Sequence, residues 1–256
     1  TLLLLGQPDN TAFYGALVLD GIAVFFKLMV LGATFLVLLA SGDFVTKRSR
    51  FSGEFYALVL FSSVGMMLMA SARELIALYV ALELSTIPLF ALAGLFRDDR
   101  STEAGIKYLV LGGLSSATLL YGMAMIFGLT GVTHLDQIAV ELNRAFVSGA
   151  EVMPALYLAI ALLVAGLAFK ISAVPFQMWA PDVYEGAPTP VTAFLSVASK
   201  AAGYAMLVRI FYSAFQDVPV NWSGLFAALA VLSMTVGNVV ALRQTNIKRM
   251  MAYSSI

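Results

Sequence analysis

The chain contains seven apolar segments that are each long enough to cross a lipid bilayer as an α-helix. The hydrocarbon core of a bilayer is about 30 Å thick, and a helix rising about 1.5 Å per residue needs roughly 20 apolar residues to span it. Of the 256 residues, 61% are hydrophobic and 12% are charged, which is more apolar surface than a soluble domain can bury. The sequence therefore predicts an all-α polytopic membrane helix bundle. The segments lie at about 19–40, 55–72, 75–96, 106–130, 152–173, 188–212 and 223–242.

The connections between these segments are short, apart from one. Residues 131–151 mix charged and apolar side chains in a way typical of a helix that lies at the membrane interface. From Thr245 onward the sequence reads as an eighth helix that is cut short at Ile256, and the chain opens at Thr1 without an initiator methionine. We therefore expect a fragment of a longer protein, with both ends missing.

Positive charges divide unequally between the two sides of the predicted bundle. Assigning the connections alternately to the two sides gives one large and one small set of lysines and arginines. The large set is Lys47, Arg48, Arg50, Arg97, Arg100, Lys107, Arg243, Lys248 and Arg249, and the small set is Arg73, Arg144 and Arg209. Because cytoplasmic connections carry the excess of lysine and arginine, the large set is expected to face the cytoplasm.

The residue types that build metal and redox sites are scarce. The chain has no cysteine and a single histidine, His134, which excludes thiolate metal sites, iron–sulfur clusters, thiol nucleophiles and disulfides. Fifteen basic residues balance fifteen acidic ones, so nothing in the net charge suggests a nucleic-acid partner. We expect no metal and no cofactor in this chain, so that the electrons of any associated redox enzyme travel elsewhere.

Three ionisable residues, Glu83, Lys170 and Lys200, lie inside the predicted spans. An ionised side chain at the bilayer centre costs at least about 2.5 to 3.5 kcal/mol on insertion scales, so such residues are functional candidates by default. Helix counting puts them roughly 12, 27 and 18 Å, respectively, from the start of their segments. Lys170 therefore lies nearer the cytoplasm than the other two by about 10 Å, a gap that tilt or a helix break would have to close. Asp20 and Lys27, at the start of the first segment, are expected to be anchoring residues.

A proline follows two of these charges at the same spacing. Pro175 comes five residues after Lys170, and the apolar sequence continues beyond it. A discontinuous helix, broken near Pro175 and resumed beyond it, would leave Lys170 at depth beside freed backbone carbonyls. Pro88 comes five residues after Glu83, and a kink there could open space for water.

Each of the three charges also has a structural interpretation. Glu83 can be a carboxyl group that stays protonated or is hydrogen-bonded to Ser85 or to a neighbouring helix. Lys200 can belong to a fixed ion pair that locks two helices together. Lys170 can extend along its helix so that its ammonium reaches the interface.

Four motifs carry a resemblance to a known family. The most specific lies within residues 169–191, where 181–188 read Pro-Asp-Val-Tyr-Glu-Gly-Ala-Pro. The others are Leu-Glu-Leu-Ser-Thr-Ile-Pro-Leu at 82–89, Glu-Ala-Gly-Ile-Lys-Tyr at 103–108, and Gln-Thr-Asn-Ile-Lys-Arg-Met-Met-Ala-Tyr-Ser-Ser-Ile at 244–256. Over nearly its whole length the chain resembles the antiporter-like membrane subunits of respiratory NADH:quinone oxidoreductase (complex I) and of multisubunit sodium/proton antiporters. The first motif resembles their N type and differs from the L and M types.

The resemblance implies a fold of about fourteen helices that holds two inverted five-helix repeats, each with a discontinuous helix near the membrane midplane. On this basis residues 1–53 would be a truncated N-terminal spanning region. Residues 54–212 would form the first proton-translocating repeat, and residues 213–256 would be the truncated start of the second, inverted repeat.

The resemblance also implies a function. The positions that match Glu83, Lys170 and Lys200 are a paired glutamate, the lysine of the broken helix and a central connecting lysine, all of which the family uses for proton transfer. A further central residue would lie beyond Ile256. The chain would then be a proton-translocating subunit of NADH:quinone oxidoreductase in a bacterial inner (plasma) membrane, without a redox site of its own. Its partners would be the other membrane subunits of complex I, the lipid bilayer, protons and internal water.

The expected mechanism is a relay controlled by charge. Opposite charges about 4 Å apart interact by about 4 kcal/mol at an effective dielectric constant of about 20. Opening a pair between Glu83 and Lys170 would therefore free a proton to move through water toward Lys200. Two alternatives stay open: a subunit of a related multisubunit Na+/H+ antiporter or membrane hydrogenase, and a structural membrane subunit without its own channel.

Overall fold

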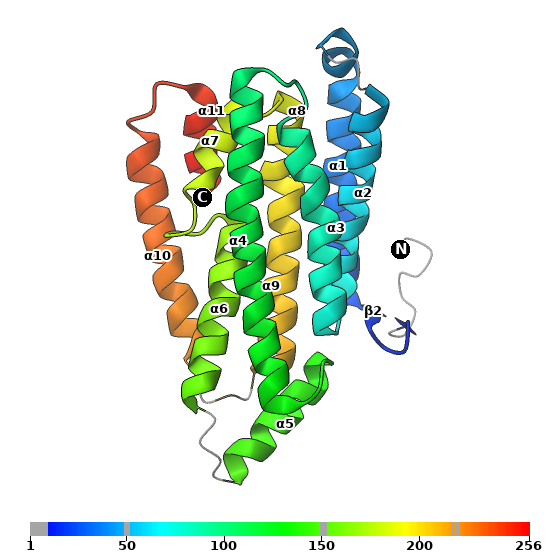
Figure 1. Ribbon diagram of the computed structural model, residues 1–256, viewed down its shortest axis with the longest axis vertical. Coiled ribbons are helices and arrows are strands. Elements are labelled where there is room, and N and C mark those ends of the chain that lie inside the picture. The colour runs from blue at the N-terminus through cyan, green and yellow to red at the C-terminus, as the bar shows by residue number, and fades with distance from the viewer. Residues whose placement is uncertain (1–9, 49–51, 149–152, 217, 219–220) are drawn as a thin grey trace.

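The computed structural model describes residues 10–48, 52–148, 153–216, 218 and 221–256. It is an elongated bundle whose long helices run side by side along one axis (Figure 1). In chain order the elements are β1 (Asn10–Ala12), β2 (Leu17–Leu19), α1 (Gly21–Arg48), α2 (Ser52–Ser71), α3 (Leu75–Ala93), α4 (Asp99–Thr130), α5 (Leu135–Val147), α6 (Met153–Ile171), α7 (Trp179–Gly186), α8 (Thr189–Phe194), the π-helical turn η2 (Leu195–Ser199), α9 (Lys200–Ala214), α10 (Trp222–Ala241) and α11 (Ile247–Ser254).

Within the part of the chain that the structure describes, seven helical stretches are long and apolar enough to cross a membrane, as the sequence predicted. They are α1 to α4, α6, the continuous stretch from α8 through η2 to α9, and α10. One clear difference lies at α4, which begins at Asp99 rather than near residue 106. Asp98 caps this helix by accepting a hydrogen bond from the Ser101 backbone N–H at 2.7 Å, so the polar first turns are helical although hydropathy does not mark them. The predicted all-α membrane bundle is confirmed.

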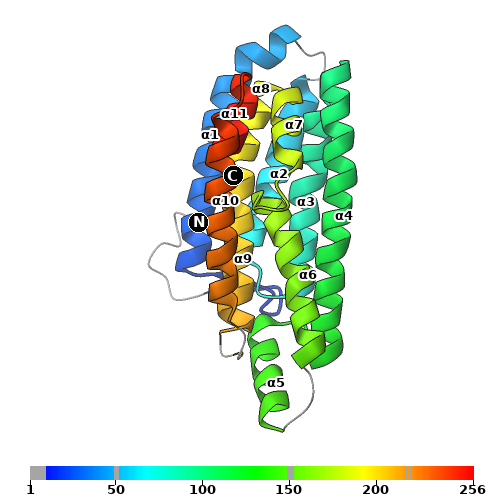
Figure 2. The same ribbon diagram turned by 90° about the vertical axis from the view of Figure 1, so that its left-hand side faces the viewer.

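The predicted helix between residues 131 and 151 is α5. It lies at the lower end of the long helices in both side views and is inclined to them in Figure 1 (Figures 1 and 2). Leu135, Ile138 and Leu142 recur at the spacing of one helix face, and all three are buried against the bundle. A short antiparallel ribbon of β1 and β2, which the sequence analysis did not predict, pairs Asn10 with Leu19.

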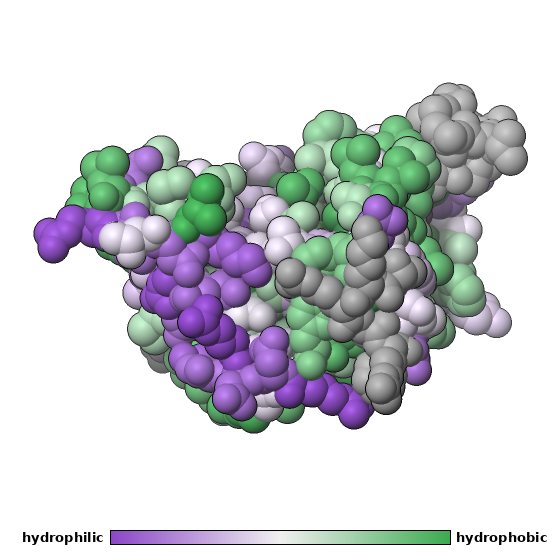
Figure 3. Space-filling view, turned by 90° about the horizontal axis from the view of Figure 1, so that it is seen from above, coloured by the Kyte–Doolittle hydropathy of each residue, from purple (hydrophilic) through white to green (hydrophobic). Residues whose placement is uncertain are grey.

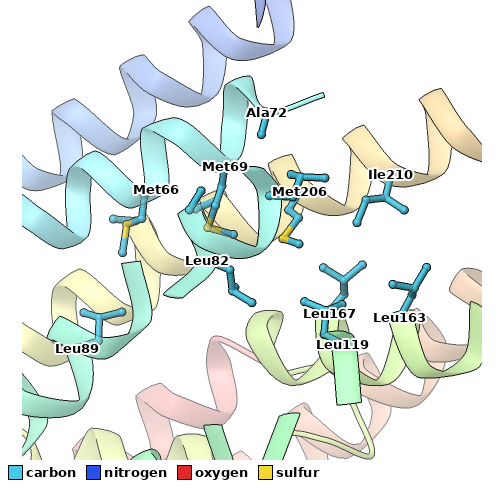
Figure 4. Close-up of a cluster of buried hydrophobic side chains, with 14 of the residues drawn as sticks. Met66, Met69, Ala72, Leu82, Leu89, Leu119, Leu163, Leu167, Met206 and Ile210 are labelled. Atoms are coloured by element: carbon cyan, nitrogen blue, oxygen red, sulfur yellow. The ribbon is translucent and has the colours of Figure 1, made fainter. Parts of the chain in front are cut away.

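Figure 4 shows a part of the core that is formed mainly by methionine and leucine side chains from five helices. Met66 and Met69 of α2 face Leu82 and Leu89 of α3, and α4, α6 and α9 close the cluster. The close-up shows Leu119, Leu163, Leu167, Met206 and Ile210 completing this contact. Large apolar side chains also cover the outside, such as Leu114 at 67% exposure, which suits a surface facing lipid or other spanning helices. Hydrophilic side chains gather instead at one end of the bundle (Figure 3).

At the opposite end, one buried ion pair ties three helices together. Arg209 of α9 donates to both carboxylate oxygens of Asp20 at 2.5 and 2.6 Å. Its guanidinium also donates twice to the Ala70 carbonyl in the last turn of α2, at 3.0 and 2.9 Å. The Arg209 side chain is only 2% exposed, so the pair is removed from water. Asp20 therefore acts as an anchor, as the sequence predicted, and Arg209 is the partner that the sequence did not reveal.

We expect Asp20→Ala to destabilise the bundle by about 3–5 kcal/mol, because it leaves the Arg209 guanidinium buried without a counter-charge. Thermal unfolding of the detergent-purified protein measures this loss. The exposed pair of Arg144 and Glu141 on α5 provides the control, since Arg144→Ala should cost less than about 1 kcal/mol. Equal effects of the two substitutions would contradict the assignment of Asp20 as an anchor.

The same ion pair predicts how stability depends on pH. Burial by itself raises the pKa of Asp20, but the hydrogen bonds from Arg209 and from the Ala23 backbone outweigh burial and hold the pKa below its ordinary value. The contribution of the pair is therefore complete above the unfolded pKa of about 4 and is lost as the pH falls through the lower, folded pKa. Unfolding followed between neutral and acidic pH should show this loss in the wild type and not in Asp20→Ala.

Candidate functional site

A helix broken inside the bundle creates the environment of the first candidate lysine. α6 ends at Ile171, the chain runs without helical structure to Met178, and α7 begins at Trp179. Ser172, in a left-handed conformation with φ of 60°, marks the break three residues before Pro175. The predicted discontinuous helix near Pro175 is thus confirmed.

The non-helical segment finds hydrogen-bond partners for its backbone within the protein. The Val174 N–H donates to the Ser233 hydroxyl of α10 at 2.9 Å, and the Trp179 indole donates to the Phe169 carbonyl at 3.0 Å. The Trp179 ring is also stacked between Phe169 and Tyr108. Irregular backbone at membrane depth is stable only when its polar groups have hydrogen-bond partners in this way. These contacts therefore stabilise the non-helical segment between α6 and α7.

Lys170 lies in the last turn of α6, directly before the break. Its side chain is 5% exposed, and its ammonium donates to the Ser85 hydroxyl at 3.2 Å and to the Thr86 hydroxyl at 2.7 Å. Both hydroxyls donate their own hydrogen to the Leu82 carbonyl, at 2.8 and 2.7 Å. Lys170 therefore does not extend to the interface: it is solvated inside the bundle by two neutral groups of α3, and the C-terminal dipole of α6 favours its positive charge.

Glu83 lies one helical turn before Thr86 on α3 but has a different partner. The Ser116 hydroxyl of α4 donates a hydrogen bond to its carboxylate, and the same hydroxyl lies 3.5 Å from the Tyr79 hydroxyl. Among the ion pairs of the described residues, none joins Glu83 to Lys170. Glu83 and Lys170 therefore have different partners: Glu83 bonds α4, and Lys170 bonds the two hydroxyls of α3.

Lys200 is the first residue of α9 and follows the π-helical turn η2. It is 7% exposed, and its ammonium donates to the Ser255 hydroxyl at 3.0 Å and to the Ser255 carbonyl. No acidic side chain pairs with it among the described residues, so the fixed ion pair that was one interpretation of Lys200 is not formed. A single π turn inside a longer helix is frequent at functional sites.

Gly203 brings the two lysines into one region. It lies one turn after Lys200 on α9, and a Cβ placed on it would be 3.2 Å from Cγ of Lys170 and 2.8 Å from Cγ2 of Ile171. The stem of Lys170 therefore packs directly on α9. The depth difference of about 10 Å that helix counting gave Lys170 is wrong, because counting assumes untilted helices with known ends.

A network of ion pairs joins α4, α7 and α11 at one end of the bundle. Lys107 of α4 bonds Glu103 at 2.6 Å and Asp182 of α7 at 2.9 Å, while Arg249 of α11 bonds Asp182 at 2.7 Å and Glu185 at 3.0 Å. Burial alone raises the pKa of Asp182, but the hydrogen bonds from Lys107 and Arg249 outweigh it and hold the pKa below its ordinary value. Asp182 thus stays ionised and ties α7 to both neighbouring helices.

Two neutral groups of the site, Thr86 and Ser116, were not predicted from the sequence, and Ser85 was expected only as a partner of Glu83. Ser85, Thr86 and Ser116 hold the candidate charges, yet hydroxyl residues are common in membrane helices and none stands out by itself. The adjacent pair Ser85 and Thr86, lying between a charge and a proline, was the available signal.

The fold and the site together define a polytopic, antiporter-like membrane bundle with a lysine buried at the break of a discontinuous helix. The family described as "NADH:quinone oxidoreductase/Mrp antiporter, TM" matches residues 72–256. The chain belongs to this family.

Similar proteins support the same conclusion. NADH-quinone oxidoreductase subunit N of Heliobacterium modesticaldum is 50% identical over 98% of this chain and 52% of its own length. A chain of respiratory complex I from Thermus thermophilus is 39% identical, with a TM-score of 0.80 over 99% of this chain and 52% of its own. A chain of an archaeal membrane-bound sulfane sulfur reductase is 33% identical, with a TM-score of 0.82 over 98% of this chain and 50% of its own. The resemblance to the N type is confirmed, and the chain spans about half the length of the curated relatives it matches.

The contact at Gly203 gives a prediction with a matched control. Gly203→Ala should destabilise the bundle by about 1–3 kcal/mol, because the new methyl group overlaps Ile171 and presses on the Lys170 stem. Gly113→Ala on α4 has open space around its Cβ and should be neutral or slightly stabilising. Thermal unfolding of the two purified variants measures the difference, and a Gly203→Ala protein as stable as Gly113→Ala would show that α6 and α9 are not in contact here.

Proposed function

We propose that this chain is part of an N-type subunit of a bacterial NADH:quinone oxidoreductase and carries protons through the inner (plasma) membrane. The observation that supports this most directly is the burial of the Lys170 ammonium on two hydroxyls, at the break of a discontinuous helix. A charge held at that depth with no acidic partner among the described residues does not serve stability, since replacing it with an apolar side chain would remove a desolvation cost.

The hydroxyls around Lys170 suit a group that gains and loses a proton. While the lysine is an ammonium, the Ser85 and Thr86 oxygens accept from it and their hydrogens go to the Leu82 carbonyl. Once the lysine becomes a neutral amine, its nitrogen gains a lone pair, and either hydroxyl can rotate to donate to it. The same two side chains therefore satisfy both protonation states, which a carboxylate in direct contact would not do.

Glu83 would control which state prevails. Its carboxylate lies on the same helix as the two hydroxyls that hold Lys170, and the Ser116 hydrogen bond holds it on the α4 side. Movement of the carboxylate toward or away from Lys170 would change their interaction by about 4 kcal/mol if the charges came within about 4 Å at an effective dielectric constant of about 20. A proton released from Lys170 would pass through internal water to Lys200, one turn from Gly203 on the adjoining helix.

The proposed function extends to the organisation of the chain and its surroundings. Residues 54–212 would form the first five-helix repeat, with 1–53 preceding it and 213–256 beginning the inverted second repeat. The end that carries the network of Lys107, Asp182 and Arg249 would face the cytoplasm. The partners would be the other membrane subunits of complex I, and the redox chemistry would take place outside this chain.

The lysines provide the test. In the assembled complex reconstituted into vesicles, Lys170→Met and Lys200→Met should lower NADH-driven proton uptake, because a thioether keeps the volume but cannot carry a proton. Glu83→Gln should lower it as well, because the amide cannot attract the ammonium. A pH-sensitive dye inside the vesicles measures uptake, and the amount of intact complex is measured in parallel.

Arg144→Gln, which removes an exposed charge on α5, is the control and should leave uptake unchanged. A purely structural subunit, the alternative from a different class, would assemble and support full uptake without Lys170 and Lys200. Uptake that depended on sodium rather than on NADH would favour the alternative of an Na+/H+ antiporter subunit.

A further inference from the structure

Helix α2 contacts the backbone of α3 directly beside the hydroxyls that bind Lys170. The Ser62 hydroxyl donates to the Ser85 backbone carbonyl at 2.7 Å, and both residues are fully buried. Three residues later, a Cβ placed on Gly65 would overlap the Ser85 backbone nitrogen and lie 2.8 Å from the Ser85 Cα. The Met69 sulfur, one turn further along, lies 3.5 Å from the Ser85 hydroxyl oxygen. One face of α2 therefore holds the residue whose side chain binds the ammonium.

The α3 backbone is weakened by a proline at this point. Pro88 lies inside α3 and has no N–H, so the Leu84 carbonyl loses the hydrogen bond that a regular helix would give it. The turn that carries Ser85 and Thr86 is therefore less constrained by its own helix than the turns before it. The hydrogen bond from Ser62 and the close approach of α2 supply a constraint from the neighbouring helix.

The hydrogen bonds to Lys170 tolerate little displacement of this turn. The Ser85 hydroxyl lies 3.2 Å from the Lys170 ammonium, and a shift of about 0.5 Å would take it out of hydrogen-bond range. A methyl group on Gly65 would force a larger shift, because carbon atoms in contact lie about 3.5–4.0 Å apart. The distance between α2 and α3 therefore decides whether Ser85 reaches the ammonium.

The next hydroxyl along α2 points to a different helix. Ser63 lies 2.8 Å from the Thr34 hydroxyl of α1 and donates to the Val59 carbonyl of its own helix at 2.8 Å. It is 3% exposed, so it is buried about as deeply as Ser62. Ser63 is therefore a matched control for Ser62, with the same side chain on the same helix but a contact with α1 in place of α3.

We propose that Ser62 and Gly65 are positioning residues, which place α3 so that Ser85 and Thr86 can hold the Lys170 ammonium. Both act through the α3 backbone and take no part in moving a proton. This inference rests on the proposed function where it concerns proton uptake, because uptake is assigned to Lys170. The positioning itself is a property of helix packing and can be measured without uptake.

The first test is a double-substitution cycle on the thermal unfolding of the complete subunit in detergent. Ser62→Ala removes one hydrogen bond and lets Ser85 move away from the ammonium. The loss in Tm should therefore be roughly twice as large with Lys170 present as in Lys170→Met, where no ammonium needs the hydroxyls. Ser63→Ala should lower the Tm equally in both backgrounds. Equal losses for Ser62→Ala in the two backgrounds would overturn the proposal.

A second measurement reads the geometry directly. In a high-resolution map of the assembled complex with Gly65→Ala, the Ser85 hydroxyl should lie more than about 3.5 Å from the Lys170 ammonium. The map of Ser63→Ala should keep the wild-type distance. If Gly65→Ala prevents assembly, Ser62→Ala tests the same contact with a smaller change in packing. An unchanged distance between Ser85 and Lys170 in these variants would contradict the proposal.

Proton uptake separates this inference from the function on which it rests. NADH-driven uptake should fall roughly tenfold in Ser62→Ala, the change equivalent to one hydrogen bond to a charged group, and stay unchanged in Ser63→Ala. If the Tm losses of Ser62→Ala are coupled to Lys170 but Lys170→Met keeps full uptake, the positioning stands and the proposed function is overturned. If Lys170→Met lowers uptake but the Tm losses are additive, the function stands and the positioning is wrong.

Discussion

The solvation of the Lys170 ammonium is the constraint on which the centre of this structure depends. Hydrocarbon offers no hydrogen-bond partner, so the protein must supply them all. The chain does so by ending α6 beside Lys170 and by placing Ser85 and Thr86 opposite it. The break in turn needs Ser233 of α10 to satisfy its backbone. Solvating one side chain thereby fixes the relative positions of α3, α6 and α10.

The bundle holds buried charge in two chemically different ways. Arg209 is paired with a carboxylate through two hydrogen bonds, and a guanidinium does not lose its proton in proteins. Lys170 and Lys200 rest instead on hydroxyl and carbonyl groups, so either lysine can become neutral without leaving an opposite charge unpaired. The first arrangement is permanent and suits an anchor at the end of the bundle. The second is reversible and suits a proton carrier in the middle.

The broken helix connects a second set of permanent ion pairs, at its α7 half, with Lys170, at the end of its α6 half. Its second half, α7, carries Asp182, which stays ionised between Lys107 and Arg249 and so locks α7 to its neighbours. Trp179, at the start of α7, donates to the Phe169 carbonyl next to Lys170. The same broken helix thus carries the ion-paired Asp182 in one half and, in the other half, Lys170, which is held by neutral groups. A displacement of α7 would reach the lysine through a single hydrogen bond and a stacked ring.

The sequence by itself determined the number and position of the spans, the interfacial helix, the break near Pro175 and the three charges inside the spans. It could do so because hydropathy, segment length and proline act locally along the chain. Only the tertiary structure decided which groups those charges meet. Glu83 bonds Ser116 rather than Ser85, Lys170 reaches residues more than 80 positions away, and Asp20 pairs with Arg209 at 189 positions. Helical periodicity shows which residues share a face of one helix, but the facing helix is set by packing of the whole bundle.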